Sequence, residues 1–284
     1  MEETRAVIPM RPLTFGELLD AAVSLLRAQA PVLLVAALVL AVGEQALLFP
    51  LRTWARIPQP YFAPQWDDLG PSWLVFCLGL TLEGTILALL GGLAGAAAGP
   101  GLLGRPVRGR QLLGQVARRT LPLLVLATVT GVILFFSAIV LMLPWPLFFG
   151  LLGLAAPALV VDRVGPFRAV GRSFKLSGRG LRGVGIRLGG YLSWFAIRLA
   201  LGLGGAAVLQ FWLRNGETGF ALAMAGIWAL VNTVAYAMLA CIDAVLYLEI
   251  RMRVEGLDVA IGRLRRLGRP IDLASSVVLG AAVR

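Results

Sequence analysis

Apolar runs of about the length of a membrane span recur along this chain of 284 residues. A helix needs about 20 mostly apolar residues to cross the hydrocarbon core of a bilayer. The fourth run is shorter than the others, so it would tilt less, thin the bilayer locally or extend past Asp162. The pattern predicts an all-α, polytopic membrane protein with six transmembrane helices in three hairpins, at residues 31–49, 73–98, 121–143, 147–161, 188–213 and 220–247.

Shorter segments between the apolar runs have one apolar and one charged face. Residues 14–29 begin with a capping-box pattern, Thr14 and Glu17, and repeat apolar residues at helical spacing. The order of amphipathic helix followed by hairpin occurs three times, which suggests three copies of one unit. We expect amphipathic helices lying on the cytoplasmic leaflet at about 14–29, 108–119, 166–187 and 251–267.

The segment 166–187 is the most clearly amphipathic of the four. Its apolar residues cluster on one side of a helical wheel and its cations lie almost opposite, although Gly178 and Gly180 argue against one unbroken helix. Two interpretations stay open: the cations only anchor and orient the chain on anionic headgroups, or they dock an acidic partner. The cations concerned are Arg168, Arg172, Lys175, Arg179 and Arg182.

These elements predict a single transmembrane domain over residues 1–267, followed by a loosely ordered C-terminal tail, 268–284. Composition agrees with membrane insertion: 58% of the residues are hydrophobic, 14% are charged, and the mean hydropathy is +0.84. A soluble domain carries about 25% charged residues. Too little polar surface is present to cover a water-soluble body of this size.

The distribution of positive charge predicts the orientation. Of the 26 Lys and Arg residues, Arg52, Arg56 and Arg214 fall on one side of the predicted spans, Arg198 falls within a span, and the other 22 fall on the opposite side. By the positive-inside rule, both termini are expected in the cytoplasm. This asymmetry also explains the net charge of +11 without nucleic acid as a partner, and points instead to anionic lipid headgroups.

The composition excludes several kinds of chemistry. The chain contains no histidine, which removes Ser-His-Asp catalysis, histidine metal ligation and the usual proton shuttle at neutral pH. Cys77 and Cys241 lie far apart inside apolar runs, so a zinc or iron–sulfur site is not indicated and both are expected as buried apolar side chains. We therefore expect no catalytic residue, metal ligand or cofactor.

Ionisable residues within the predicted spans are the best candidates for a functional site. Glu83 and Arg198 each lie ten residues into a span, about 15 Å deep at the rise of an α-helix. An unpaired arginine at that depth costs at least about 2.5 kcal/mol. We predict a Glu83–Arg198 ion pair with Asp243 as the competing partner, serving either to fix helix register or as part of a substrate or ion pathway. Glu44 falls in the outer part of the first span, facing an external vestibule or reaching headgroups.

Gly91, Gly95 and Gly99 stand four residues apart in the second span. Small residues at this spacing let helix backbones approach closely, so we expect them at a helix-packing contact.

Three stretches carry a resemblance to a known family: 11–22 (RPLTFGELLDAA), 156–174 with its APALVVDRVGP and GRSF motifs, and 246–258 (LYLEIRMRVEGLD). Together they resemble the membrane domain attached to some glycerophosphoryl diester phosphodiesterases, which also occurs in stand-alone bacterial, especially actinobacterial, multi-pass proteins. The resemblance implies this fold and a place in the bacterial plasma membrane. It does not imply hydrolysis, because the catalytic domain of the fused enzymes is a separate histidine-containing TIM barrel, for which this chain has no room.

Three functions remain as hypotheses. The first is a non-enzymatic scaffold or accessory subunit that binds another membrane protein or a second copy of itself. The second is a transporter or channel for a lipid or small solute, with Glu83, Arg198 and Asp243 along a polar cavity that reaches the membrane midplane. The least favoured is a membrane-embedded enzyme, whose acidic residues would gather only at the cytoplasmic surface.

Overall fold

The computed structural model describes residues 8–57, 69–105, 107–213 and 218–274. Its described residues form helices and no strand. Five of these helices are long and apolar enough to cross a membrane, which agrees with a multi-pass membrane protein. They are α2 (Ala30–Trp54), α3 (Leu69–Leu102), α5 (Thr120–Ile139), α9 (Arg182–Leu209) and α10 (Thr218–Glu255).

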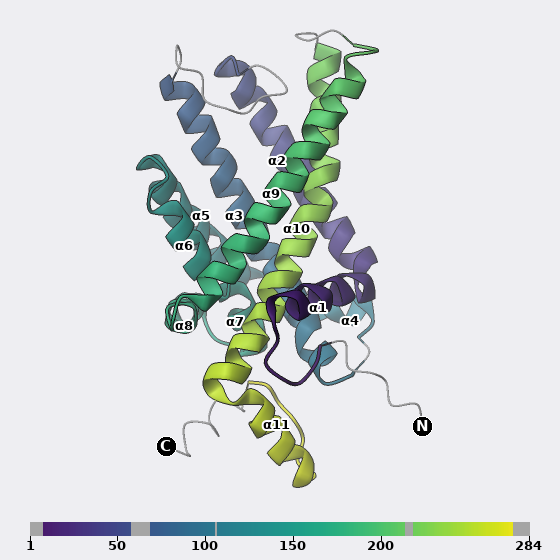
Figure 1. Ribbon diagram of the computed structural model, residues 1–284, viewed down its shortest axis with the longest axis vertical. Coiled ribbons are helices and arrows are strands. Elements are labelled where there is room, and N and C mark those ends of the chain that lie inside the picture. The colour runs from purple at the N-terminus through teal and green to yellow at the C-terminus, as the bar shows by residue number, and fades with distance from the viewer. Residues whose placement is uncertain (1–7, 58–68, 106, 214–217, 275–284) are drawn as a thin grey trace.

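Helix α10 is the central helix of the bundle. In its most apolar window 83% of the residues are buried inside the protein, against 17% for α9. It contacts α2, α3, α9 and the N-terminal helix α1 (Phe15–Ala28), so elements from distant parts of the sequence meet on it (Figure 1). Large apolar side chains such as Val39 on α2 and Leu192 on α9 stay exposed, as expected of helices whose other neighbours are lipid tails.

The fourth predicted span is not a continuous helix. Residues 147–161 divide between α6 (Trp145–Leu152) and α7 (Ala155–Val161), with Gly153 and Leu154 between them. Pro157 explains the position of the break, because it has no N–H to donate to the carbonyl of Gly153 and its ring would clash with that group in a continuous helix. The count of six crossings therefore stays a prediction.

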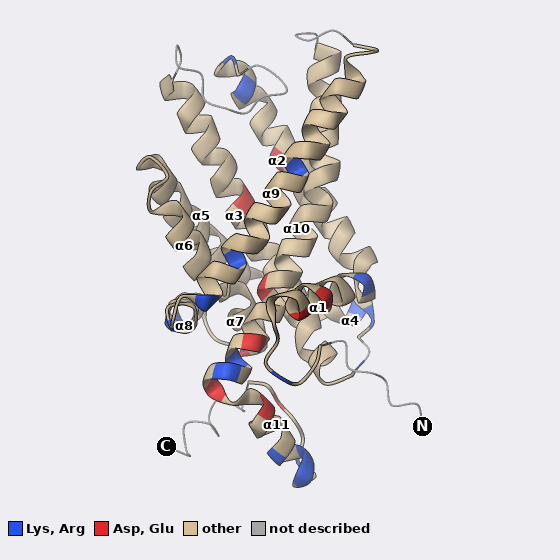
Figure 2. Cartoon of the chain, in the orientation of Figure 1, with Lys and Arg blue, Asp and Glu red and all other residues tan. Residues whose placement is uncertain are grey.

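Shorter helices gather toward one end of the bundle, where most of the charged residues also lie (Figure 2). The capping box predicted at the start of the first is present: Thr14 N donates to the Glu17 carboxylate, and Glu17 N donates to the Thr14 hydroxyl. The hydrogen bond from the Thr14 backbone and the nearby Arg11 guanidinium lower the pKa of Glu17 to about 2. These helices are α1 (Phe15–Ala28), α4 (Gly109–Ala117), α8 (Pro166–Ser177) and α11 (Leu257–Arg266).

Two of the predicted amphipathic helices have different bounds in the structure. The segment 166–187 breaks after α8, where Gly180 and Leu181 have positive φ angles of 75° and 55°, so residues 182–187 belong to the long helix α9. The segment 251–267 breaks at Gly256, with φ of 65°, so residues 251–255 continue α10. The expectation from Gly178 and Gly180 that the segment 166–187 is not one unbroken helix is confirmed. Hydropathy periodicity located neither break, because each depends on a left-handed residue between two helical segments.

Part of the predicted tail is held against the bundle. The backbone carbonyl of Leu273 accepts a hydrogen bond of 3.2 Å from Arg251 Nη2, and the Leu273 side chain is buried. The rest of the predicted tail, residues 275–284, lies outside the described residues.

Candidate functional site

The Glu83–Arg198 pair forms inside the bundle between α3 and α9. Arg198 Nη1 lies 2.8 Å from Glu83 Oε1, and both side chains are less than 10% exposed. The Tyr191 hydroxyl donates to the other carboxylate oxygen at 3.2 Å. The Arg198 guanidinium carbon lies 5.4 Å from the ring centre of Tyr191 and 5.7 Å from that of Tyr236, within the range of cation–π attraction. The pairing that depth along the two spans predicts is therefore present.

Glu44 on α2 is buried next to this pair and has a different set of partners. The Tyr236 hydroxyl lies 2.9 Å from Glu44 Oε1, Asn232 Nδ2 donates to Oε2 at 3.1 Å, and Gln45 Nε2 lies 3.4 Å from the same oxygen. No cation lies within ion-pair distance of Glu44 in the part of the chain that the structure describes. The expectation that Glu44 faces an external vestibule or headgroups is wrong, because α10 covers it.

Helices α2, α3, α9 and α10 thus meet at one set of polar side chains, here called the buried polar cluster. Within it Glu83 pairs directly with Arg198, whereas Glu44 is linked to a guanidinium group only through Gln45, whose side-chain oxygen accepts a hydrogen bond of 2.8 Å from Arg52 Nη1. Among the described residues, Asn232 Oδ1 and Arg198 Nε have no hydrogen-bond partner, so some capacity to bind a small polar molecule remains. The members of the cluster are Glu44, Glu83, Tyr191, Arg198, Asn232 and Tyr236.

Asp243 does not compete for Arg198, because it pairs with Arg187. Arg187 Nε and Nη2 donate to the two carboxylate oxygens at 2.8 and 3.0 Å. The Arg187 guanidinium also lies 3.9 Å from the ring centre of Phe149. Gly153 makes room for it, since a Cβ atom at that position would overlap the guanidinium. Arg187, expected at the end of an amphipathic helix, is instead a buried residue of α9.

A second set of charges joins α7, α8 and α10 at the end where the short helices gather. Asp162, the C-cap of α7, pairs with Arg251 at 2.9 Å and with Arg172, and it accepts a hydrogen bond from Tyr247. Glu255 pairs with Arg172 at 2.8 Å and with Arg251 at 2.9 Å. We call these five residues the α7–α8–α10 ion network. Two carboxylates meet two guanidinium groups in it, so the charges balance.

This network changes the assignment of the five cations expected to contact headgroups or a partner. Arg172 is only 17% exposed and already holds two carboxylates, so it is not available to headgroups. Arg182 is 44% exposed, lies 3.5 Å from Glu249, and donates to a backbone carbonyl before α1. The remaining three cations are exposed: Arg168, Lys175 and Arg179.

The glycine positions lie at close contacts of α3. A Cβ atom at Gly91 would lie 3.3 Å from a side chain of α7, and one at Gly95 would lie 2.9 Å from Pro157 Cα. A Cβ atom at Gly99 would lie 3.2 Å from Leu273, in the segment after α11. The glycines therefore bring α7 and the C-terminal segment close to the α3 backbone.

Sequence reasoning missed several members of these sites. Asn232 and Tyr236 are four residues apart in an apolar span, so helical spacing could have placed them on one face. The same does not hold for Arg187 and Arg251, which are not distinguishable by spacing from neighbouring arginines that remain exposed.

Comparison with protein-family models, with curated proteins and with solved structures finds no match for this chain. The resemblance to the membrane domain of glycerophosphoryl diester phosphodiesterases stays a prediction. Both cysteines are buried and free.

Proposed function

We propose that this chain is a non-enzymatic module of the bacterial plasma membrane, a scaffold or accessory subunit that presents a basic surface at the cytoplasmic leaflet. The observation that carries this proposal is the cross-helix pairing of charges inside the bundle. Arg198 pairs with Glu83, and Arg187 pairs with Asp243, each between different helices. Removing one partner of a buried pair typically costs about 3–5 kcal/mol, so such pairs hold helices in one register.

The proposed topology has six crossings in three hairpins, with α6 and α7 together as the fourth. Residues 145–161 would measure about 25 Å as a straight helix, somewhat less than the thickness of the hydrocarbon core. Local thinning of the bilayer accommodates a short span at modest cost. Both termini are then cytoplasmic, on the side that carries 22 of the 26 cations.

The acidic residues at the cytoplasmic end give little support to an enzyme. Asp162, Glu249 and Glu255 each form ion pairs with arginines, and among the described residues Glu249 Oε2 has no hydrogen-bond partner, so the ion pairs occupy most but not all of the oxygens of these acids. The resemblance to the phosphodiesterase-associated membrane domain supports the same conclusion, since in that family hydrolysis belongs to another domain.

A transporter or channel is the second candidate, and one observation favours it. Glu44 is a buried carboxyl group with several hydrogen-bond donors and, among the described residues, no direct ion pair, since Arg52 reaches it only through Gln45; the nearby Asn232 Oδ1 has no partner among the same residues. Intramembrane carboxyl groups with such surroundings occur in solute and proton pathways.

Reconstitution of the full chain into lipid vesicles distinguishes the two functions. A scaffold leaves proton flux, potassium flux and the transbilayer movement of a fluorescent phospholipid at the rates of protein-free vesicles. It also co-purifies from native membranes with a partner, or with a second copy, in a fixed ratio. Flux above that background which Glu44→Gln abolishes, while the exposed control Ser193→Ala keeps it, would replace the scaffold with the transporter.

A further inference from the structure

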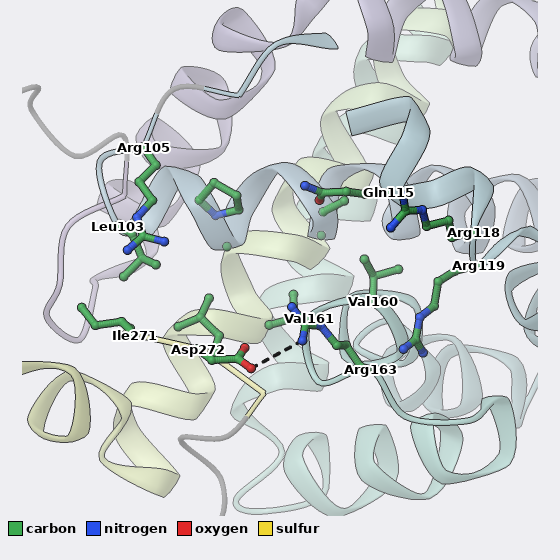
Figure 3. Close-up of a pocket in the computed structure, with 15 residues that line it drawn as sticks. Leu103, Arg105, Gln115, Arg118, Arg119, Val160, Val161, Arg163, Ile271 and Asp272 are labelled. Atoms are coloured by element: carbon green, nitrogen blue, oxygen red, sulfur yellow. Dashed lines mark hydrogen bonds and ion pairs between the residues drawn. The ribbon is translucent and has the colours of Figure 1, made fainter. Parts of the chain in front are cut away.

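A cavity of about 790 Å³ lies apart from the buried polar cluster, at the end of the bundle where the short helices gather (Figure 3). Its walls come from the C-terminal end of α3, from α4, from the end of α7, and from the segment that follows α11. Its volume is in the range of cavities that hold small-molecule ligands and cofactors.

The lining of the cavity is strongly basic. Arg105, Arg118, Arg119 and Arg163 line it together with one acidic residue, Asp272, which gives a formal charge of +3. Figure 3 shows Arg105 on one side of the view and Arg118 and Arg119 on the other. Four guanidinium groups around one cavity favour an anionic ligand, because each presents a planar set of donors that matches a phosphate group.

These arginines are only weakly engaged by the protein itself. Arg105 and Arg118 are exposed, and among the described residues neither has a hydrogen-bond or ion-pair partner. Arg119 makes a long hydrogen bond of 3.5 Å to the Val164 carbonyl. Most of their donors are therefore free for a ligand, in contrast to those of the α7–α8–α10 ion network.

Asp272 occupies part of the cavity as an internal anion. Its carboxylate lies 3.4 Å from Arg163 Nη1, and the two side chains are 47% and 63% exposed. An ion pair this long and this exposed is weak, so an incoming anion can replace it.

Much of the remaining lining is apolar. Gly95 and Gly99 of α3, Val160 of α7 and Leu273 contribute to it, and the glycines leave the α3 backbone close to the cavity. A lining that combines arginines with apolar residues, at the proposed cytoplasmic ends of apolar helices, matches a molecule with a phosphate group and an adjoining apolar part. Basic pockets between transmembrane helices on this side of a membrane bind anionic lipid headgroups.

We propose that this cavity binds a phosphate compound through its arginines, Arg105 on one side and Arg118 and Arg119 on the other, with Asp272 as an internal anion that the phosphate displaces from Arg163. The phosphate belongs to an anionic phospholipid headgroup or to a soluble phosphate ester. The site is independent of the proposed scaffold function, since a transporter with this structure would have the same cavity.

The test measures ligand binding to the full chain, purified in detergent and stripped of lipid. Native mass spectrometry counts bound phosphatidylglycerol or phosphatidic acid, with phosphatidylcholine as the zwitterionic comparison. Isothermal titration with inorganic phosphate and glycerol phosphate supplies the soluble arm. Binding of the anionic lipids alone identifies a headgroup site, and binding of the soluble phosphates identifies a site for a free ester; either result supports the proposal.

Three variants make the test specific. Arg105→Gln/Arg118→Gln should weaken phosphate binding about tenfold for each arginine removed, as expected for charge-assisted hydrogen bonds. Arg168→Gln/Lys175→Gln removes two exposed cations of α8 outside the cavity and should change affinity less than twofold. Asp272→Asn removes the internal anion and should increase affinity several-fold. All five positions are partly or fully exposed, so the variants are expected to fold.

The arginines have one other role that would produce the same arrangement. Arg105 and Arg163 follow the ends of α3 and α7, where cations stabilise helix C-termini. That role alone predicts a lower unfolding temperature for Arg105→Gln/Arg118→Gln without a change in phosphate binding. Such a result, an equal loss in the α8 control, or the absence of binding to every phosphate compound would overturn the proposal.

Discussion

The Glu83–Arg198 pair offers the sharpest test of how this bundle is held together. Replacing Arg198 with Gln leaves Glu83 buried between α3 and α9 without its guanidinium partner, and Glu83→Gln leaves the arginine in the same position. The ion-pair distance of 2.8 Å and the exposure below 10% place the pair in the class for which loss of one partner costs about 3–5 kcal/mol. The double variant Glu83→Gln/Arg198→Gln removes both charges and leaves two amide groups that can form a hydrogen bond with each other. It should therefore lower the stability of the chain by less than the more destabilising of the two single variants.

The measurement is the apparent unfolding temperature of the full chain in one detergent at a fixed heating rate, because membrane proteins rarely unfold reversibly. The single variants should lower it by on the order of 10 °C, and the double variant by clearly less. Ser193→Ala, at an exposed position of α9, the helix that also carries Arg198, should change the apparent unfolding temperature by about 1–2 °C or less. Additive losses in the double variant would refute the argument, because they would mean that the two charges do not stabilise each other.

Three further predictions follow from other contacts. Gly153→Ala should destabilise the chain by about 1–3 kcal/mol, because the new methyl group overlaps the Arg187 guanidinium. Gly171→Ala, which has open space around its Cβ, should be neutral or slightly stabilising. Thermal unfolding of both variants tests this, and equal changes in unfolding temperature would contradict the close contact at Gly153. Asp162→Asn should lower the free energy of unfolding by about 3–5 kcal/mol, because it removes one of the two carboxylates that face the arginines of the α7–α8–α10 ion network. Raised salt should not restore the lost stability in a denaturation experiment, since the network is largely buried. A cysteine at Arg266 should react with an impermeant thiol reagent only after the cells are opened, and one at Thr53 should react in intact cells; the reverse pattern would invert the topology.

Properties carried by short stretches of sequence were predicted well. The capping box at Thr14 and Glu17 starts α1 within one residue of the expected position, because its hydrogen bonds are local. Depth along two spans was enough to pair Glu83 with Arg198, since few ionisable groups share that level of the bundle. The glycines of α3 mark a close contact for a similar reason: a stripe of small residues has no use on a lipid-facing surface.

Predictions that needed a neighbour in space were less successful. A helical wheel placed Arg172 among the exposed cations. It contains no information on neighbouring helices, and in the structure α7 and α10 bring Asp162 and Glu255 into contact with Arg172 on α8. Glu44 was expected near the surface, whereas partners 188 and 192 residues away on α10 enclose it. The break between α6 and α7 was missed because hydropathy is unchanged across it.

The sequence by itself therefore determined that the chain is helical and apolar enough for a membrane, and which segments are apolar and which are basic. These are sums over local composition, to which each residue contributes independently of the fold. Only the tertiary structure decided which charges are paired, which stay free, and where a basic cavity opens beside α3. Those outcomes depend on how helices from distant parts of the chain pack, and an arginine has the same residue type whether a carboxylate lies within 3 Å or not.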